Sequence, residues 1–182
     1  QQSLLVWVGN AFQQEILTLE EFGWFYSIYA TARRPGQIRA LRICDLSTQS
    51  NDNRIIYELD IPRAKQRDGQ FRQEFRSLQI TEDIYLVLKN LTEIIRKKAK
   101  AHLKELTESE LVQLPIFISF SRFYECKNIY EFKTILNQTP DYFHLSYSEA
   151  NYMNKVLSRK CEAISERTGD YIHFTHVRCR RT

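Results

Sequence analysis

Arginine and lysine side chains gather in four short clusters along this chain of 182 residues, and they are the side chains best suited to bind phosphate. The clusters comprise Arg33, Arg34, Arg39 and Arg42; Arg63, Lys65, Arg67, Arg72 and Arg76; Arg96, Lys97, Lys98, Lys100 and Lys104; and Arg178, Arg180 and Arg181. If they converge in the fold, they form a phosphate-binding surface. If they do not, each is a solvated face, which is the interpretation we favour for the 96–104 run inside an amphipathic helix.

The elements that must position the first two clusters can be read from capping residues and hydrophobic periodicity. Thr18 and Glu21 form a capping-box pattern, which predicts a helix start, and a stripe of aromatic side chains follows at helical spacing. Pro35 predicts the first turn of another short helix. Residues 54–61 and 71–79 alternate as strands, and Asp68-Gly69 between them is typical of a hairpin turn. The 61–79 segment therefore predicts a basic β-hairpin.

The second half of the chain predicts helices. One begins after Thr81 and runs to about residue 105, another ends near residue 114, and residues 123–138 are helical. A second capping box, at Ser146 and Glu149, begins a helix that stops at Gly169, and Thr175 precedes a last helix. The expected fold is α+β and mainly α-helical, with a small antiparallel β-sheet in one domain over residues 1–182.

Composition excludes several classes of protein. Apolar residues make up 43% of the chain, too many for a disordered protein, and no stretch approaches the roughly 18 apolar residues that a membrane span needs. No signal peptide opens the chain, so we expect an intracellular domain. Cys44, Cys126, Cys161 and Cys179 lack the close paired spacing of metal ligands. They are predicted to be buried free thiols, and no metal or cofactor site is predicted.

The segment from Ala30 to Leu46 resembles the first arginine motif of the tyrosine recombinases, the phage integrase family, which reads approximately T-G-x-R-x-x-E-[LI]-x-x-L-x-x-x-D-[LI]. In this match Arg34 takes the place of the first catalytic arginine, and Leu41, Asp45 and Leu46 match the end of the motif. Gln37 stands where the family has Glu or Asp. An amide can hydrogen-bond a guanidinium but cannot neutralise it, so we expect weaker support of Arg34 from this position.

Two further motifs follow in the family's order. The basic hairpin resembles the one that carries the family's catalytic lysine, and Lys65 takes that position, with Arg67 as the rival in the same turn. The last residues resemble the second arginine motif, H-x-x-R-[HR]-T, and aligning the final Arg-Arg-Thr makes Arg180 its arginine. Val177 then stands at the histidine position, with His176 one residue earlier, and spacing does not decide whether His176 takes that role.

The resemblance implies an incomplete recombinase catalytic domain that cuts and rejoins double-stranded DNA. Arg34 and Arg180 would clamp one phosphate, and Lys65 would be the general acid. DNA contacts are expected from Arg33, Arg63, Arg67 and Arg72. The family's tyrosine nucleophile follows the second arginine motif, and none of the ten tyrosines here does.

The resemblance also implies further copies of the chain on DNA, no cofactor, and a cytoplasmic, nucleoid-associated bacterial or phage-encoded protein. The alternatives are a DNA-binding module without catalytic activity, and an interaction domain with solvated charges.

Overall fold

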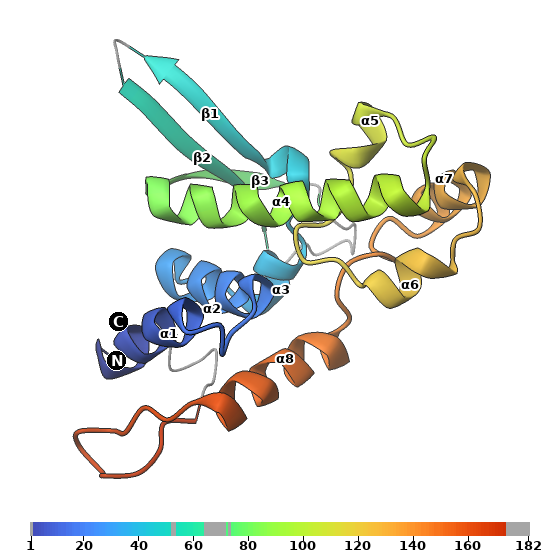
Figure 1. Ribbon diagram of the computed structural model, residues 1–182. Coiled ribbons are helices and arrows are strands. Elements are labelled where there is room, and N and C mark those ends of the chain that lie inside the picture. Colours follow the sequence, from blue (N-terminus) through green and yellow to red (C-terminus); the bar gives the residue numbers. More distant parts are fainter. Residues whose placement is uncertain (1, 52–53, 64–71, 73, 174–182) are drawn as a thin grey trace.

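The computed structural model describes residues 2–51, 54–63, 72 and 74–173 (Figure 1). Its elements are helices α1 (Gln2–Gln13), α2 (Leu19–Thr31) and α3 (Pro35–Arg39), the 3-10 turn η1 (Ile43–Asp45), strands β1 (Leu46–Asn51), β2 (Arg54–Pro62) and β3 (Phe75–Ile80), and helices α4 (Glu82–His102), α5 (Glu108–Leu111), α6 (Phe120–Glu125), α7 (Ile129–Gln138) and α8 (Tyr147–Lys160). The described part is a mixed α+β structure, mainly helical with a small antiparallel sheet, which confirms the predicted fold class at that level.

The sheet has the strand order β1-β2-β3, and both pairs are antiparallel. Leu59 at its centre pairs with Leu46 on one side and Leu78 on the other. The prediction of β2 is confirmed, and the strand predicted over 71–79 is present as β3 from Phe75 to Ile80, with residues 71 and 73 lying outside the described part of the chain. Strand β1 was not predicted, because its sequence, LSTQSN, is a polar edge strand whose regularity comes from pairing with β2 rather than from an apolar face.

Helix α4 packs between the sheet and α2 (Figure 1). The predicted capping box that begins α2 is present: the Thr18 N–H donates to Glu21 Oε2 at 2.9 Å, and the Glu21 N–H donates to Thr18 Oγ1 at 3.2 Å. Gly23 permits a close approach of the two helices, since a Cβ at this position would lie 2.6 Å from Leu91 Cδ1. The arginine-bearing helix that follows α2 is thereby held against a rigid core.

Only the inner half of β2 is buried. Leu59 and Ile61 have almost no exposed surface, whereas Ile55, on the same alternating face, is 62% exposed. At this end β1 and β2 extend away from α4, as Figure 1 shows. The predicted alternation of residues 54–61 is therefore matched by burial only in the half of β2 nearest Pro62, which leads into residues 63–74, hereafter the basic segment.

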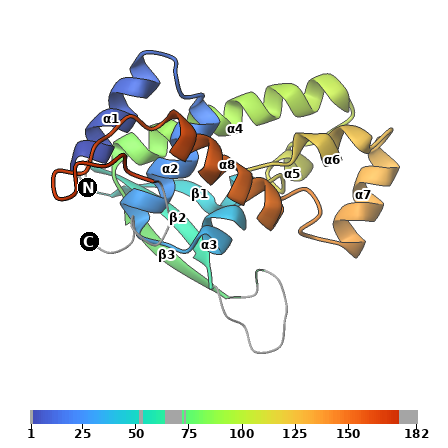
Figure 2. The same cartoon turned by 90° about the horizontal axis from the view of Figure 1, so that it is seen from below.

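Aromatic side chains fill the core on both sides of α4. Trp24 meets Phe117 edge-on at 5.2 Å between ring centroids, and Phe123, Phe132 and Phe143 form a second cluster. Helices α5, α6 and α7 gather around this second cluster, at the C-terminal end of α4 (Figures 1 and 2). The single helical stretch predicted for 123–138 is two helices, because Asn128 caps α7 by accepting a hydrogen bond from the Glu131 N–H.

Helix α8 begins at the second predicted capping box but ends earlier than predicted. Ser146 accepts from the Glu149 N–H at 3.1 Å, and the last helical residue is Lys160. Gly169 is not the stop of this helix; it lies in a later turn with φ 73°, and its N–H donates to the Ser165 carbonyl. The intervening chain folds back, with the Ile172 N–H donating to the Ala163 carbonyl, so tertiary closure overrides the helical pattern.

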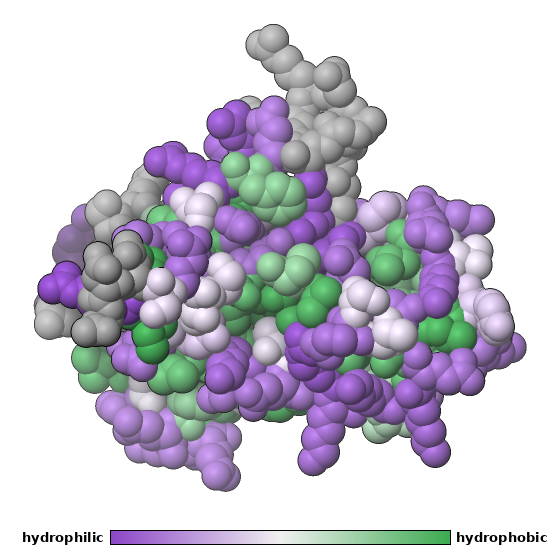
Figure 3. Space-filling view, turned by 90° about the horizontal axis from the view of Figure 1, so that it is seen from above, coloured by the Kyte–Doolittle hydropathy of each residue, from purple (hydrophilic) through white to green (hydrophobic). Residues whose placement is uncertain are grey.

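Polar side chains cover most of the face seen in Figure 3, with apolar side chains visible between them. Lys97, Lys98 and Lys100 are exposed on α4, which confirms the predicted solvated face for these three residues of the 96–104 run. Lys104 is exposed just beyond the end of α4, and Arg96 pairs with Glu108. In the part of the chain that the structure describes, no helix is long and apolar enough to cross a membrane.

Candidate nucleic-acid interface

Arg34 lies at the start of α3, on an abrupt connection from α2. Helix α2 ends at Ala32, whose left-handed backbone (φ 51°) turns the chain, and Arg34 is the N-cap residue of α3 with Pro35 at the first helical position. The Arg34 side chain is exposed, and that of Arg33 is half-buried. The tight turn between two helices therefore presents Arg34 at the surface while its backbone is fixed.

Gln37 connects the start of α3 to the end of β2. Its Oε1 accepts a long hydrogen bond (3.3 Å) from the Arg34 N–H, and its Nε2 donates to the Pro62 carbonyl at 2.9 Å. The second bond needs an N–H donor, which the carboxylate found at this position in the recombinase motif does not have. The amide thus has a positive role here, tethering the arginine helix to the chain that leads toward Lys65.

Arg63 lies at the base of the basic segment. Its N–H donates to the Glu74 carbonyl at 2.8 Å, and its guanidinium pairs with the Glu74 carboxylate at 2.7 Å, with both side chains more than half exposed. An exposed pair of this kind is weak and is open to exchange for a phosphate. Lys65 and Arg67, in the predicted hairpin turn, and Arg180, in the second arginine motif, lie outside the described residues.

Arg72 points into the fold instead of away from it. Its two terminal nitrogens each donate to a different oxygen of Asp45, at 2.6 Å, and one of them also donates to the Ala40 carbonyl. The Arg72 side chain is 8% exposed and that of Asp45 is 5% exposed. For Arg72 to contact DNA, as its place in the basic cluster predicts, this bidentate ion pair would have to open.

Four arginines around α3 have no carboxylate partner among the described residues: Arg33, Arg34, Arg39 and Arg42. Arg42 donates instead to two neutral oxygens, Gln113 Oε1 and the Pro140 carbonyl, each at 2.8 Å. Burial lowers the pKa of Arg42, and the positive charge of Arg72 lowers it further. Arg33, Arg34 and Arg39 therefore carry positive charge that no ion pair among the described residues neutralises, and such charge favours an anion.

Sequence reasoning missed the contribution of α8 to this region. Arg39 stacks on the ring of Tyr147, the first residue of α8, with its guanidinium carbon 4.2 Å from the ring centroid. The ring of Tyr147 is largely exposed. Arg39 belongs to the first basic cluster, but no pattern in the sequence pairs it with a tyrosine more than a hundred positions later, because only the packing of α8 brings them together.

His144 was also missed, and it lies beneath the same arginines. Its Nδ1–H donates to the Arg39 carbonyl at 2.8 Å, and the residue is buried. Burial lowers the pKa of His144 to about 3, with the charges of Arg42 and Arg72 acting in the same direction and the bond to Arg39 opposing them. A neutral His144 at pH 7 supports the backbone of α3 and does not act as a cationic ligand.

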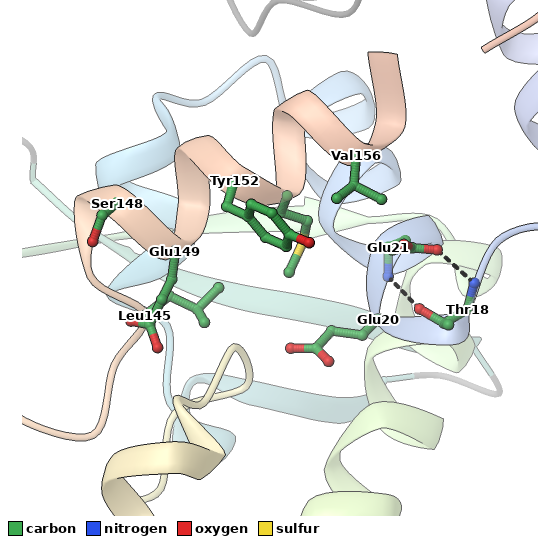
Figure 4. A pocket seen from close by; sticks show the side chains of 9 residues that line it. Thr18, Glu20, Glu21, Leu145, Ser148, Glu149, Tyr152 and Val156 are labelled. Carbon is green, nitrogen blue, oxygen red and sulfur yellow. Dashed lines mark hydrogen bonds between the residues drawn. The ribbon is translucent and has the colours of Figure 1, made fainter. Parts of the chain in front are cut away.

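A groove of about 610 Å³ lies between the start of α2 and α8 (Figure 4). Glu20 and Glu149 face it among apolar side chains such as Leu145. Burial raises the pKa of Glu20, and the charge of Lys98 opposes this shift. The lining includes none of the predicted site residues, and its acidic side chains disfavour phosphate.

The prediction of buried free thiols is correct for two of the cysteines that the structure describes and wrong for Cys44. Cys126 and Cys161 are buried, and burial raises the pKa of Cys126 to about 11, which keeps it an inert thiol. Cys44 is exposed, contrary to the prediction, because it lies on the outer side of the 3-10 turn. Among the residues described, no three His, Cys, Asp or Glu side chains are grouped as metal ligands.

Comparisons of the chain with protein-family models, with curated proteins and with solved structures find no match.

Proposed function

We propose that this chain is part of the catalytic domain of a tyrosine-type site-specific DNA recombinase, which cuts and rejoins double-stranded DNA through a 3′-phosphotyrosyl intermediate. The observation that carries the proposal is the setting of Arg34. Arg34 is exposed at the start of α3, has near it in sequence other arginines without an ion-pair partner among the described residues, and is tethered through Gln37 to the end of β2. The order of helix, arginine motif, antiparallel sheet and further helices supports the same proposal.

The chemistry required of Arg34 is stabilisation of negative charge on a phosphodiester. A planar guanidinium binds two nonbridging oxygens at once and stabilises the additional charge that develops on them in the pentacoordinate transition state. Arg180 would bind the same phosphate from the other end of the sequence. The backbone of Arg34 is already fixed at the helix start, so only its side chain has to be ordered when it binds.

The remaining chemical steps belong to residues implied by the recombinase resemblance. Lys65 would donate a proton to the leaving 5′ oxygen. A tyrosine downstream of the second arginine motif would attack the phosphorus, releasing that 5′ oxygen and forming a 3′-phosphotyrosyl bond. Attack by a 5′-hydroxyl on this bond would release the tyrosine and rejoin the strand. The proposal includes several copies of the chain on DNA, and a cytoplasmic, nucleoid-associated location.

DNA binding by the chain provides the first test. We expect weak binding to a duplex oligonucleotide, with affinity falling steeply as salt rises. Arg34→Ala should weaken this binding and lower the slope of log affinity against log salt by about 1, as expected for the loss of one phosphate contact. Arg54→Ala is the matched control, because Arg54 is also exposed but begins β2 at the opposite end of the strand from Pro62. Binding without salt dependence, or equal effects of the two variants, would contradict the proposal.

Covalent trapping separates the recombinase from a DNA-binding module without catalytic activity. We expect no adduct with a nicked suicide duplex from this chain alone. A protein that joins it to the downstream tyrosine should form one, and Arg34→Ala should slow that step by about 10²–10³-fold. Lys65→Ala should also slow it, with rescue by a 5′-thiolate leaving group that needs no proton. DNA binding without any adduct from the longer protein would favour the non-catalytic module.

A further inference from the structure

Arg72 occupies an unusual place for a residue of a basic segment. Its side chain is almost fully buried, and its guanidinium makes short hydrogen bonds to both oxygens of Asp45 and to the Ala40 carbonyl. The ring of Phe75 packs on the guanidinium, with 5.0 Å from the guanidinium carbon to the ring centroid. A buried arginine needs this degree of pairing, because an uncompensated charge is strongly unfavourable inside a protein.

The backbone conformation of Arg72 indicates that its ion pair with Asp45 holds the residue in place. Its φ is 64°, in the left-handed region that residues other than glycine seldom adopt. Such a conformation persists where surrounding contacts determine it. The contacts to Asp45 and Ala40 are of this kind, since the guanidinium reaches them from the turn that precedes β3.

Arg72 bonds to Ala40 and Asp45, which lie at the two ends of the short segment that follows α3. Ala40 is the C-cap of α3, so its carbonyl marks the end of the helix that Arg34 begins. Asp45 closes the 3-10 turn, where its Oδ2 also accepts from the Arg42 N–H at 2.7 Å. One guanidinium therefore fixes both the end of α3 and the turn that leads into the sheet.

The first turn of α3 is bonded to the chain that enters the basic segment. Gln37 is bonded to the carbonyl of Pro62, which precedes that segment, whereas Arg72 lies where the chain returns from it. Arg63 and Glu74 join the two limbs by a backbone hydrogen bond of 2.8 Å. Helix α3 is thus fastened to both limbs, at its first turn through Gln37 and at its C-cap residue Ala40.

From this geometry we propose that Arg72 is a positioning residue for Arg34 and not a phosphate ligand. This inference rests on the proposed function, in which Arg34 binds the phosphate. By bonding Ala40 and Asp45, Arg72 fixes the orientation of α3 relative to the sheet and so fixes the point from which Arg34 reaches the DNA. Arg72 belongs to the basic cluster by sequence and to the core by structure.

Amide hydrogen exchange on the DNA-free chain tests the positioning directly. Arg72→Met should speed exchange of the Ala40 and Leu41 amides, which close the last turn of α3, by at least about tenfold, while amides inside α4 stay protected. Arg76→Met is the matched control, because it makes the same change on the exposed face of β3 and should leave both amides unchanged. If Ala40 and Leu41 exchange equally in the two variants, the inference is wrong.

Arg72→Met leaves the Asp45 carboxylate buried without its partner, so the same measurements are made with Arg72→Met combined with Asp45→Asn. This double variant removes the buried charge and should unfold near the wild-type temperature, while the two amides still exchange fast. Restored protection of Ala40 and Leu41 in this variant would show that charge burial, and not the tether, explained the first result, and would overturn the inference.

A double-mutant cycle in duplex DNA binding separates positioning from phosphate binding. In the charge-neutralised Asp45→Asn background, Arg72→Met should weaken binding when Arg34 is present and change it little when Arg34→Ala is also present. A phosphate ligand would instead give its full loss in both cases and lower the salt slope by about 1 each time. If the wild-type chain does not bind DNA at any salt concentration, the proposed function fails, and the exchange experiment still decides whether Arg72 holds α3.

Discussion

Replacing Gln37 with glutamate would test the link between the arginine helix and the sheet. The Gln37 Nε2 donates to the carbonyl of Pro62 at 2.9 Å, and Pro62 is buried. Glutamate has nearly the same shape, but at neutral pH its carboxylate has no proton to donate. The variant would place a carboxylate oxygen where the amide nitrogen now lies, against a carbonyl oxygen.

The variant should lose stability because the buried Pro62 carbonyl loses its hydrogen-bond donor. A buried acceptor that loses its donor costs about 1–3 kcal/mol, so the free energy of unfolding should fall by that amount at pH 7. In a chain of this size the melting temperature falls by about 2–4 °C for each kcal/mol. Loosening α3 should also weaken DNA binding through Arg34, because Gln37 lies in the first turn of the helix that Arg34 begins.

The decrease in the free energy of unfolding of Gln37→Glu should depend on pH. A carboxyl group facing a carbonyl is more stable when protonated, so its pKa in the folded protein lies above the unfolded value of about 4.3. The exposed Arg34 acts in the opposite direction, but solvent screens its charge. Because the folded pKa is raised, the variant is closest to wild type below about pH 4, where the introduced carboxyl group is protonated and donates to the carbonyl, and its deficit grows as pH rises through the folded pKa.

Urea unfolding of wild type and variant between pH 4 and pH 7 measures both effects. Gln14→Glu is the control, since it makes the same charge change at an exposed position after α1 and should alter stability little at either pH. Equal stability of Gln37→Glu and wild type at pH 7, or a deficit larger at pH 4 than at pH 7, would refute the reasoning about the Pro62 carbonyl.

Two further predictions concern helix packing and acid stability. Gly23→Ala should raise the free energy of unfolding less than Gly9→Ala does, because its Cβ would lie 2.6 Å from Leu91 Cδ1, and the overpacking cost of about 1–3 kcal/mol offsets the roughly 1 kcal/mol that alanine gains over glycine in a helix. Gly9→Ala, with nothing within 4 Å of the new Cβ, should raise it, and urea unfolding compares the two. Burial opposes ionisation of Glu149, but bonds from Ser119 and Ser146 and the charge of Arg122 outweigh it and lower its pKa to about 2. Glu149→Gln should therefore destabilise fully above pH 4.5, and the difference in melting temperature from wild type should shrink as pH falls toward 2; a constant difference would contradict this assignment.

The parts of the fold that could be predicted from the sequence are those fixed by local rules. Both capping boxes begin helices where predicted, because the Ser or Thr hydroxyl and the Glu three residues later satisfy each other's neighbouring N–H groups. The alternation of β2 and the long amphipathic α4 are also local, since each element shows its own apolar face. Strand β1 has no such face and is defined only by its partner, so no periodicity reveals it.

In the candidate site, too, only the residues placed by local sequence rules could be predicted. Arg34 could be located because the motif fixes its spacing and Pro35 fixes the helix start. The direction of a side chain beyond a turn depends on tertiary contacts, so Arg72 could be assigned to the basic cluster but not to the core. His144 gives no sequence signal, because a histidine between Phe143 and Leu145 reads only as part of an apolar run.

The charges around α3 explain why glutamine, and not an acid, suits position 37. Asp45 is the carboxylate within the motif, and its two oxygens are already occupied by Arg72. A second acid at position 37 would place negative charge beside Arg34 and offset the excess of positive charge that an incoming phosphate would meet. The amide keeps the helix attached to the Pro62 carbonyl without changing that charge. The departure from the family's motif is therefore consistent with an arginine surface whose counter-ion is a phosphate from outside the protein.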